Sequence, residues 1–360
     1  MTVRRSTDDL ADHRSRVRGS LLGGALGDAL GAPVEFDSIT DIRGRYGFAG
    51  VTGLVPDHRG RIGLVTDDTQ MTLFTVEGLI RGGDVPAVRH AYLRWLDTQR
   101  YPAPQRDRPH GTGRLREQGW LYARRAPGNA CLSGLTYGPA APAPFGEPGP
   151  VNPGSKGCGT VMRSAPFGYG APDARHAFEL AARCAQITHG HPTGYLAAGA
   201  FAAMIHLALA GEPLAQAVRG AADLLTDYPS HEETSLALRA AVRLAAQGDP
   251  SPERVESLGG AWVAEEALAI AVYCALAHPW PGELRQALLL AVNHSGDSDS
   301  TGAVCGNLLG ALHGQRALPA DWLADLEGRE TITEIADDFA AWTAGEPPVN
   351  DSWAERYPLD

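Results

Sequence analysis

The sequence predicts an all-α protein folded as one compact multi-helix domain, and three of its features support this. Apolar residues make up 44% of the 360 residues, enough to bury a substantial core. Aromatic residues make up only 7%, whereas Ala and Gly are abundant, and strands favour aromatic and β-branched side chains. Apolar residues also recur at helical spacing over most of the second half. We expect the domain at residues 16–345, between flexible tails at 1–15 and 346–360.

The first expected helix covers residues 17–31 and carries a glycine at every fourth position, namely Gly19, Gly23, Gly27 and Gly31. This spacing places the glycines on one face, where another backbone can approach closely because no side chain intervenes. A dinucleotide-binding interpretation of this segment fails. No strand is expected before it, and its glycines do not follow the G-x-G-x-x-G spacing.

The next segments alternate between irregular and helical patterns. Residues 38–65 are rich in Gly and Arg and are expected to form a loop, followed by helices at 68–81 and 86–99. Residues 101–153 are rich in Pro and Gly, which is typical of an interdomain linker or of a long loop over a site. We favour the loop, because segments with candidate chemistry lie on both sides of it.

Residues 173–312 show a nearly continuous helical pattern. Gly- and Pro-containing breaks interrupt it at four places, which are 189–192, 211–213, 248–252 and 278–281. A last helix is expected at 332–343. No repeat of fixed length is visible, so a single helical domain accounts for the whole pattern.

Charge and composition restrict the partners and the compartment. A formal net charge of −11 repels phosphate backbones, so general nucleic-acid binding is not expected. Five cysteines without a C-x-x-C pair indicate neither a zinc ribbon nor a disulfide framework. No apolar stretch typical of a secretory signal occurs at the N-terminus, and the apolar run 195–210 contains His206 and is expected in the core. We expect a cytoplasmic monomer without a membrane segment.

Two adjacent carboxylates, Asp67 and Asp68, lie in the segment TDDTQ at an expected loop-to-helix junction. Asp67 with Gln70 three residues later fits a variant of the capping box, and acidic side chains favour helix N-termini in any case. Helix capping is therefore the simplest explanation of this segment taken alone. A cap explains only one of the two mutually repelling carboxylates, whereas a bound hard cation explains both.

A second acidic segment, NHSGDSDSTG, spans residues 293–302. Its Asp297 and Asp299 offer oxygen ligands for Mg²⁺ or Ca²⁺. An EF-hand is excluded, because the twelfth position counted from Asp297 is Leu308, where a Glu is required. A helix cap is again the alternative. One such loop offers too few ligands for magnesium, whereas two loops that meet in space are sufficient.

Three further segments carry candidate binding groups. The glycine-rich segment 154–159 contains Lys156, the only lysine of the chain, and such a turn presents backbone N–H groups to a diphosphate, although many such turns bind nothing. His189 and His191 share no helix face and do not suggest zinc, so a His at a helix end is the simpler interpretation. Glu35 lies in the segment GAPVEF. A surface residue in a turn is the simplest interpretation of it, and nothing in the neighbouring sequence argues against this.

Together, and in this order, the five segments resemble the ADP-ribosylglycohydrolase family, which includes the dinitrogenase reductase-activating glycohydrolase. The matching segments run from residue 19 to about 314, and they are GSLLGGALGDALGAPVEF, TDDTQM, GCGTVMRSAPFG, THGHPTG and GDSDSTG. Each segment alone is modest evidence, whereas five in the right order are strong evidence.

The resemblance implies an all-α fold with a binuclear Mg²⁺ site, sometimes Mn²⁺, at the bottom of a cleft. The metal ligands that it implies are Thr66, Asp67, Asp68, Asp297, Asp299 and Ser300. It places Glu35 on a mobile segment over the site, so we expect the catalytic groups among Asp67, Asp68, Asp299 and Glu35. The substrate-binding residues that it implies are Gly154, Ser155, Lys156, Gly157, Cys158, Gly159 and His189.

Three residues depart from the pattern that the family usually shows. Ser300 stands where a Thr is usual, and its hydroxyl oxygen is retained. Cys158 stands where many relatives carry Asn, and a thiol is a poor hydrogen-bonding group, so one substrate contact is expected to be missing. Lys156 stands where some relatives place an aromatic ring on adenine. The resemblance therefore leaves adenine recognition and the substrate open.

We therefore expect a metal-dependent hydrolase that cleaves the N- or O-glycosidic bond between ADP-ribose and a modified protein or small molecule. Four alternatives stay open at this point. They are a non-catalytic protein that binds ADP-ribose, a hydrolase of a small ADP-ribosyl metabolite, an unrelated Mg²⁺ phosphohydrolase, and a helical interaction protein whose acidic segments are only caps. The sequence does not decide between arginine, serine and nucleotide linkages.

Overall fold

The computed structural model describes residues 7–348 except 106 and 108–109, and residues 350–358. The all-α prediction is confirmed, since this part of the chain contains helices and no strand, with one isolated bridge between Gly157 and Val263. The α-helices are α1 Thr7–Gly31, α2 Ile39–Tyr46, α3 Asp67–Arg81, α4 Val85–Arg100, α5 Asn129–Gly134, α6 Ala174–Ala185, α7 Pro192–Leu209, α8 Leu214–Leu225, α9 Glu232–Ala245, α10 Pro252–Glu256, α11 Ala264–Ala277, α12 Leu284–Val292, α13 Ser298–His313, α14 Ala320–Ala324, α15 Arg329–Thr343 and α16 Asp351–Arg356.

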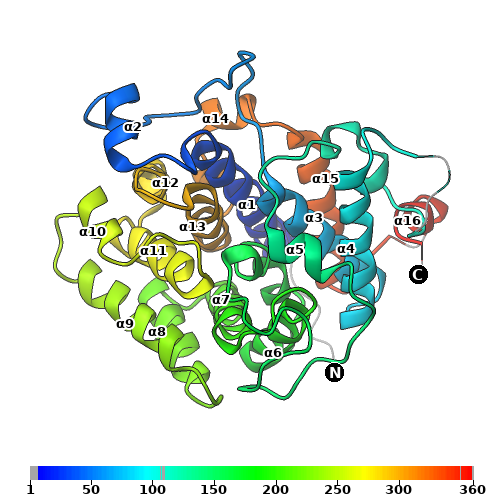
Figure 1. Cartoon of the computed structure of the whole chain (residues 1–360). Helices are drawn as coiled ribbons and strands as arrows, with labels where there is room; N and C mark the ends of the chain where they lie inside the picture. The colour runs from blue at the N-terminus through cyan, green and yellow to red at the C-terminus, as the bar shows by residue number, and fades with distance from the viewer. Residues whose placement is uncertain (1–6, 106, 108–109, 349, 359–360) are drawn as a thin grey trace.

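Helices α1 and α13, from opposite ends of the sequence, run side by side through the middle of the molecule (Figure 1). The glycine stripe of α1 faces a second stripe on α13, so that Gly27 lies against Gly302 and Gly23 against Gly306. A methyl group added to Gly27 would clash with the carbonyl oxygen of Gly302, which leaves no space for a side chain at this crossing. The close backbone contact predicted from the glycine spacing is therefore confirmed.

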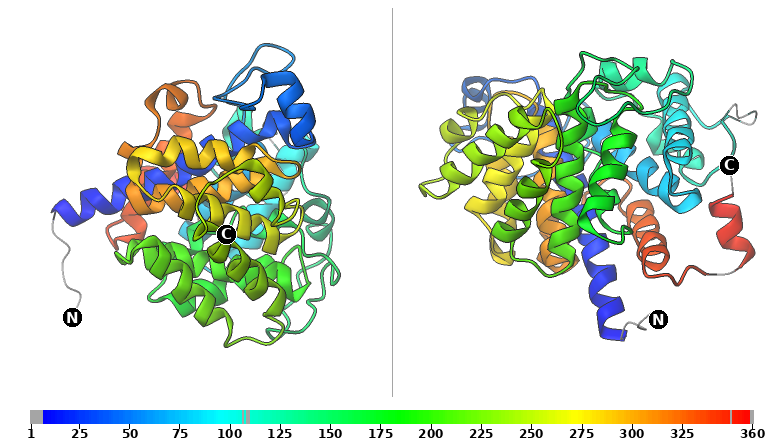
Figure 2. Two further views of the ribbon diagram at one scale, coloured as in Figure 1. Left: turned by 90° about the vertical axis from the view of Figure 1, so that its left-hand side faces the viewer. Right: turned by 90° about the horizontal axis from the view of Figure 1, so that it is seen from below.

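The other helices surround this central pair. Helices α3 and α15 contact one side of α1, and α4 packs on α3. Helices α11 and α12 contact α13, and α7, α8 and α9 extend the layer beyond them (Figures 1 and 2). Helix α7 is long and apolar enough to cross a membrane by length and composition, but 83% of that window is buried inside the protein. The apolar run 195–210 thus lies mostly in the core, as expected.

Several boundaries differ from those expected. Helix α1 begins at Thr7, so the segment expected as a flexible tail is helical from that residue onward, and residues 1–6 lie outside the described part. The expected loop 38–65 contains α2, which begins with a capping box between Ser38 and Asp41. The C-terminal segment contains α16, and the Tyr357 hydroxyl donates to Asp338 at 2.9 Å.

Helix ends position the chemically interesting residues. Asp67 and Asp68 form the first turn of α3, and Asp297 directly precedes α13. Glu35 follows a short 3₁₀ helix, Ala32–Val34, that continues α1. Because α1 contacts both α3 and α13, the packing around the central pair brings all three helix ends to one region.

Candidate metal and active site

The two acidic segments meet in one cavity of about 480 Å³, which we call the acidic cavity. Asp67 and Asp68 line it from α3, and Asp297, Asp299 and Ser300 line it from the start of α13. The Gly-rich loop contributes Ser155, Gly157, Cys158 and Gly159, and the remaining walls include Glu35, Met162 and His189. The structure therefore brings together most of the residues that the sequence singled out.

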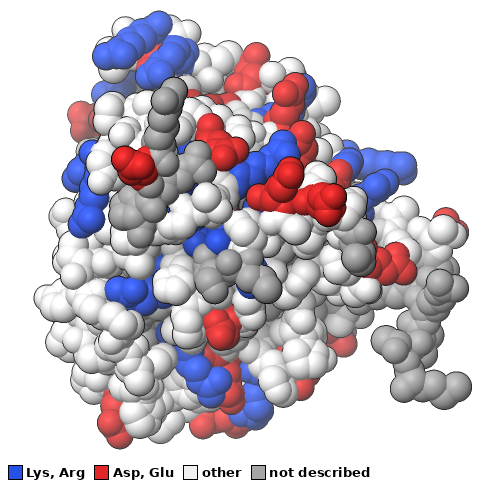
Figure 3. All heavy atoms as spheres, turned by 90° about the vertical axis from the view of Figure 1, so that its right-hand side faces the viewer, with Lys and Arg blue, Asp and Glu red and all other residues white. Residues whose placement is uncertain are grey.

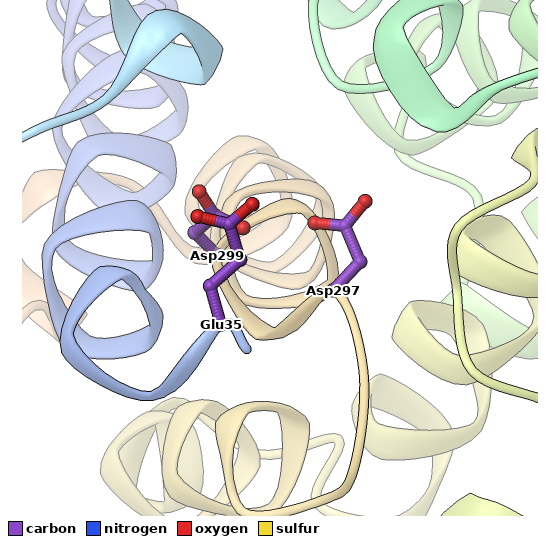
Figure 4. Close-up of side chains that lie close together, drawn as sticks. All are labelled: Glu35, Asp297 and Asp299. Atoms are coloured by element: carbon purple, nitrogen blue, oxygen red, sulfur yellow. The ribbon is translucent and has the colours of Figure 1, made fainter. Parts of the chain in front are cut away.

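Glu35, Asp297 and Asp299 form the tightest group in this cavity. One carboxylate oxygen from each lies within 4.8 Å of the others, and all three side chains are buried. Figure 4 shows Glu35 reaching Asp299 from the end of α1, with the Asp297 carboxylate facing them from the other side. Carboxylate oxygens at this separation are suited to share a divalent cation.

Helix capping does not account for these carboxylates. The capping group of α3 is the Thr66 hydroxyl, which accepts from the Asp68 backbone N–H at 3.3 Å, so neither Asp67 nor Asp68 is needed for this role. Asp297 occupies the N-cap position of α13, but its side chain accepts no capping hydrogen bond. The caps-only interpretation of the two acidic segments is therefore not supported.

A sixth buried carboxyl group, Asp28 of α1, holds the first acidic segment in place. Both of its oxygens lie 3.0 Å from the Thr66 backbone nitrogen. Its Oδ2 also accepts from the backbone N–H of Thr69 at 3.0 Å and from the Thr69 hydroxyl at 2.5 Å. Asp28 is not among the residues predicted from the sequence, although an Asp within the apolar run 21–30 was a signal that could have identified it.

Burial raises the pKa values of all six carboxyl groups, and the charge of Asp299 adds to this effect for the other five. Burial raises the pKa of Asp67 to about 8, with a further contribution from the charge of Asp299. Burial raises the pKa of Glu35 to about 10, and Asp299 and Asp297 add to this effect. Burial and the charge of Asp299 also raise the pKa values of Asp68 and Asp297 well above their ordinary value. In the protein alone, this cluster therefore favours protons over negative charge.

A divalent cation would relieve the repulsion between the ionised carboxylates of the acidic cavity, and the oxygen donors of the cavity suit such an ion. None of the ion pairs among the described residues involves the cavity carboxylates of Glu35, Asp67, Asp68, Asp297 or Asp299. The Oδ1 atom of Asp68 is buried without a hydrogen-bond partner. An all-oxygen donor set with an unsatisfied buried oxygen is typical of a site for a hard divalent cation.

The Gly-rich loop is fixed against the segment that precedes α11. The Cys158 backbone N–H donates to the Trp262 carbonyl at 3.3 Å, and the Ala264 N–H donates to the Lys156 carbonyl at 2.8 Å. The Cys158 thiol donates to Asp297 at 2.6 Å, and burial together with the charge of Asp297 raises the pKa of this thiol. The Cys158 thiol is thus hydrogen-bonded to Asp297, so only the backbone of Cys158 is left to contact a substrate.

His189 lines the acidic cavity, and Thr188 and Arg163 fix the orientation of its imidazole ring. Its Nδ1 lies 2.8 Å from the Thr188 hydroxyl, and that hydroxyl accepts from Nη2 of Arg163 at 2.6 Å. Burial, helped by the charge of Arg163, lowers the pKa of His189 to about 3. The imidazole is therefore neutral at neutral pH, and its Nε2 edge is the part left to face the cavity.

Two expected substrate-binding residues do not line the acidic cavity. Lys156 forms ion pairs with Glu233 at 2.7 Å and with Glu265 at 2.5 Å. Gly154 lies in a neighbouring surface hollow with Ser155. The ammonium group of Lys156 is thus neutralised by two carboxylates, and the geometry does not direct it toward the diphosphate position that the resemblance implied.

The rim of the acidic cavity also contains residues that were not predicted from the sequence. The rings of Phe36 and Trp262 stack at a centroid separation of 5.6 Å, and both residues line the cavity although they are exposed. Residues 126–130, which include the first two residues of α5, form another wall, and the Gly128 N–H donates to Asp67 at 3.2 Å. These contacts join segments far apart in the chain, so the sequence carried little signal for them.

This architecture belongs to a known class. The sequence pattern described as ADP-ribosylglycohydrolase matches residues 9–348, and the chain therefore belongs to the ADP-ribosylglycohydrolase family. The activity of this family is hydrolysis of ADP-ribose linkages, which makes the chain a glycohydrolase at the level of class.

Individual relatives are similar over nearly their whole length. The ADP-ribosyl-[dinitrogen reductase] glycohydrolase of Rhodospirillum rubrum is 27% identical over 326 residues, which cover 87% of this chain and 90% of the relative. The ADP-ribosylhydrolase ARH3 of Bos taurus is 27% identical over 352 residues, with 89% and 91% covered. A solved structure described as an ADP-ribosylglycohydrolase-related protein complex superposes with a TM-score of 0.62 at 26% identity, and covers 93% of this chain and 99% of that one.

Proposed function

We propose that the protein is a divalent-metal-dependent hydrolase of the bond between the distal ribose of ADP-ribose and a modified target. The observation that carries this proposal is the meeting of two acidic segments, 230 residues apart at Asp67 and Asp297, in one cavity beside the Gly-rich loop and His189. Family membership supports the ADP-ribose linkage, and the donor set supports the metal.

Two Mg²⁺ ions are the proposed occupants of the acidic cavity, with Mn²⁺ as a substitute. Asp67, Asp68, Asp297 and Asp299 would hold them, together with the hydroxyl oxygens of Ser300, which lines the cavity, and of Thr66, which lies 3.5 Å from Oδ2 of Asp68. When bound, the ions supply positive charge that grips the ribose hydroxyls and lowers the pKa of a water molecule. Five carboxyl groups line this cavity, which is more than one cation requires and favours a pair.

The carboxyl groups of the chain divide the remaining tasks. Cleavage at the anomeric carbon develops positive charge on the ribose ring, and nearby carboxylates stabilise it. Glu35 is the proposed group that covers the site, excludes water and handles a proton, because it belongs to the segment after α1 and its pKa is raised to about 10 by burial and by Asp299. Asp67, Asp68 or Asp299 would orient the attacking water.

The opposite wall would hold the rest of ADP-ribose. Ser155 and residues 157–159 line the cavity beside the acidic cluster, and their backbone groups are the proposed contacts to the diphosphate. His189 would contribute a neutral hydrogen-bonding edge to a ribose hydroxyl or a phosphate oxygen. The proposed substrate is an ADP-ribosylated protein or small molecule, and the proposed location of this monomer is the cytoplasm.

A substrate panel tests the proposal. Pure protein is incubated with peptides ADP-ribosylated on serine or arginine, with ADP-ribosylated nucleic acid and with a small ADP-ribosyl compound, each with Mg²⁺ or with EDTA, and products are identified by mass. Release of ADP-ribose only with the metal supports the proposal. Release of AMP or inorganic phosphate would indicate a phosphohydrolase, and tight binding of ADP-ribose without turnover of any substrate would indicate a non-catalytic binding protein.

The Asp299→Ala variant is the second part of this test. It should lose most activity and bind Mg²⁺ more weakly while its circular dichroism spectrum stays unchanged, because Asp299 lies on a helix whose packing face is formed by other residues. Asp321→Ala, which removes an exposed carboxylate of α14, serves as the control and should retain activity. A fully active Asp299→Ala protein would refute the ligand assignment.

A further inference from the structure

A second cavity, of about 600 Å³, adjoins the acidic cavity and has the opposite charge. The two share Glu35, Phe36 and Ala126 as lining residues. The second cavity, which we call the arginine-lined cavity, carries two carboxylates, Glu35 and Asp57, against five arginines, which are Arg45, Arg59, Arg61, Arg124 and Arg125. In a chain of net charge −11, such a concentration of guanidinium groups calls for an explanation.

Only part of this positive charge is neutralised within the protein. Arg45 pairs with Asp37 at 2.8 Å, Arg61 with Asp57 at 2.9 Å, and Arg125 with Glu327 at 2.5 Å. The two others, Arg59 and Arg124, are exposed and have no ion-pair partner among the described residues. The cavity therefore presents at least two guanidinium groups that are free to bind an anion.

The position of the arginine-lined cavity indicates which part of a substrate it would meet. The Gly-rich loop and His189 line the acidic cavity and are not part of the arginine-lined one. If ADP-ribose lies along the Gly-rich loop with its distal ribose at the acidic cluster, the bond to be cleaved points away from that loop. The shared residues Glu35 and Phe36 then stand at the scissile bond, and the arginine-lined cavity lies beyond them.

We propose that the arginine-lined cavity binds the acceptor side of the substrate and selects an acidic peptide segment next to the ADP-ribosylated residue. This inference rests on the proposed function and deepens it. Planar guanidinium groups bind carboxylates through paired hydrogen bonds, whereas a cationic acceptor, such as an arginine-linked one, is repelled. An acceptor bonded through a hydroxyl and flanked by Asp or Glu is the best match.

A peptide fits this cavity better than nucleic acid does. Recognition of a phosphate backbone requires an extended basic surface, and the overall charge of −11 opposes it. On the face shown in Figure 3, basic and acidic side chains are interspersed. The unpaired guanidinium groups of Arg59 and Arg124 lie instead in one cavity, whose volume of about 600 Å³ suits a short segment.

Matched peptides test this inference. Three synthetic peptides carry the same ADP-ribosylated serine and differ only in flanking residues that are acidic, neutral or basic. With Mg²⁺, we expect kcat/KM to be about tenfold higher for the acidic than for the basic peptide, and the difference to shrink with salt. The double variant Arg59→Glu/Arg124→Glu should reverse the order. Arg219→Glu, an exposed arginine of α8 outside both cavities, should keep it.

A binding measurement keeps the two proposals separate. A fluorescein-labelled Glu-rich peptide without ADP-ribose should bind the wild-type protein, and the double variant should weaken this binding about tenfold while the affinity for free ADP-ribose stays unchanged. Equal kcat/KM for the three peptides, or no effect of the double variant on peptide binding, overturns the inference and leaves the proposed function standing. ADP-ribosylated nucleic acid could instead react faster than the acidic peptide, and the double variant could abolish this preference. That result would show that nucleic acid, not a peptide, occupies the arginine-lined cavity. Absence of any turnover, with peptide binding retained, overturns the proposed function and the scissile-bond placement with it.

Discussion

The Thr188 hydroxyl lies 2.8 Å from Nδ1 of His189 and determines which edge of the imidazole carries its hydrogen. Arg163 can only donate, so the hydroxyl accepts from its Nη2 at 2.6 Å and has its own hydrogen left to donate. The Ala185 carbonyl, at 3.5 Å, is the weaker acceptor of that hydrogen. Nδ1 therefore accepts it, and Nε2 keeps the imidazole hydrogen and presents it to the cavity.

The variant Thr188→Val tests this arrangement, because valine has the same shape without the hydroxyl. We expect the affinity for ADP-ribose to fall roughly tenfold, the effect of losing one oriented hydrogen bond of about 1.5 kcal/mol. The nitrogen-15 NMR chemical shifts of the His189 imidazole should change from values typical of the Nε2–H tautomer to values typical of a mixture of the two tautomers. Thr188→Ser should retain the wild-type values.

A matched control separates orientation from stability. Thr75→Val removes another buried hydroxyl, which lies 2.8 Å from the Tyr92 hydroxyl and outside both cavities. It should lower the melting temperature without changing ADP-ribose affinity. An Nδ1–H tautomer in the wild-type protein would show that the assignment of the hydrogen is wrong.

The variant Asp28→Asn should weaken metal binding although Asp28 is not an expected ligand. Its carboxylate accepts from the backbone N–H groups of Thr66 and Thr69, which fixes the turn that carries Asp67. An amide cannot accept all of these bonds at once, and groups that orient metal ligands are typically worth about 10–100-fold in metal affinity. Mg²⁺ titration by calorimetry measures the change. Asp41→Asn, in the exposed cap of α2, is the control, and equal affinities in both variants would contradict the role of Asp28.

Stability in the absence of metal should fall as pH rises. The pKa values of Asp67 and Asp28 are raised to about 8 and about 7, in both cases by burial first and by Asp299 second. The folded state thus holds protons that the unfolded chain releases above its ordinary carboxyl pKa, so the folded form loses stability from about pH 4 to about pH 8. The melting temperature with EDTA should be lower at about pH 8 than at about pH 5.

Added Mg²⁺ should reverse this trend, because a cation stabilises the ionised form of the cluster. We expect Mg²⁺ to raise the melting temperature more at about pH 8 than at about pH 5. The variant Asp299→Ala should show a smaller pH effect with EDTA, since Asp299 contributes to both raised pKa values. An equal effect of Mg²⁺ at both pH values would show that the cluster does not bind the metal in its ionised form.

The variant Gly27→Ala should destabilise the protein, despite the higher helix propensity of alanine. The added methyl group would meet the backbone of Gly302, which no side-chain rotation can relieve. We expect the free energy of unfolding to fall by about 1–3 kcal/mol. Gly44→Ala is the matched control, because a methyl group on this glycine of α2 meets nothing within 4 Å, and it should be neutral or stabilising. Equal stabilities would refute the close α1–α13 contact.

The fold was largely predictable because local patterns encode it. Helix α7 and the break before it follow from apolar content and from Pro192, and the α1–α13 contact follows from glycine spacing. The start of α1 at Thr7 was missed because that segment is polar and projects from the body of the molecule, as Figure 2 shows. Helix α2 was missed because Gly and Arg surround a capping box that spans only Ser38 to Asp41.

The site was predictable where a residue type is unusual in its place, and not where its role depends on distant partners. Paired carboxylates such as Asp67 and Asp68 are visible in the sequence. The ion pairs that hold Lys156 join it to Glu233 and Glu265, which are 77 and 109 residues away in the chain. No local pattern encodes such contacts, and so Lys156 was predicted to be a substrate-binding residue.

The close contact between the glycine stripes of α1 and α13 also determines when the protein can become active during its synthesis. Asp28 and Glu35 leave the ribosome early, but Asp297 and Asp299 arrive with α13, after more than four-fifths of the chain has been made. Until then the glycine face of α1 has no partner helix and the cation ligands are incomplete. A nascent or truncated chain that ends before α13 therefore has neither its central packing nor its metal centre, and it cannot act prematurely.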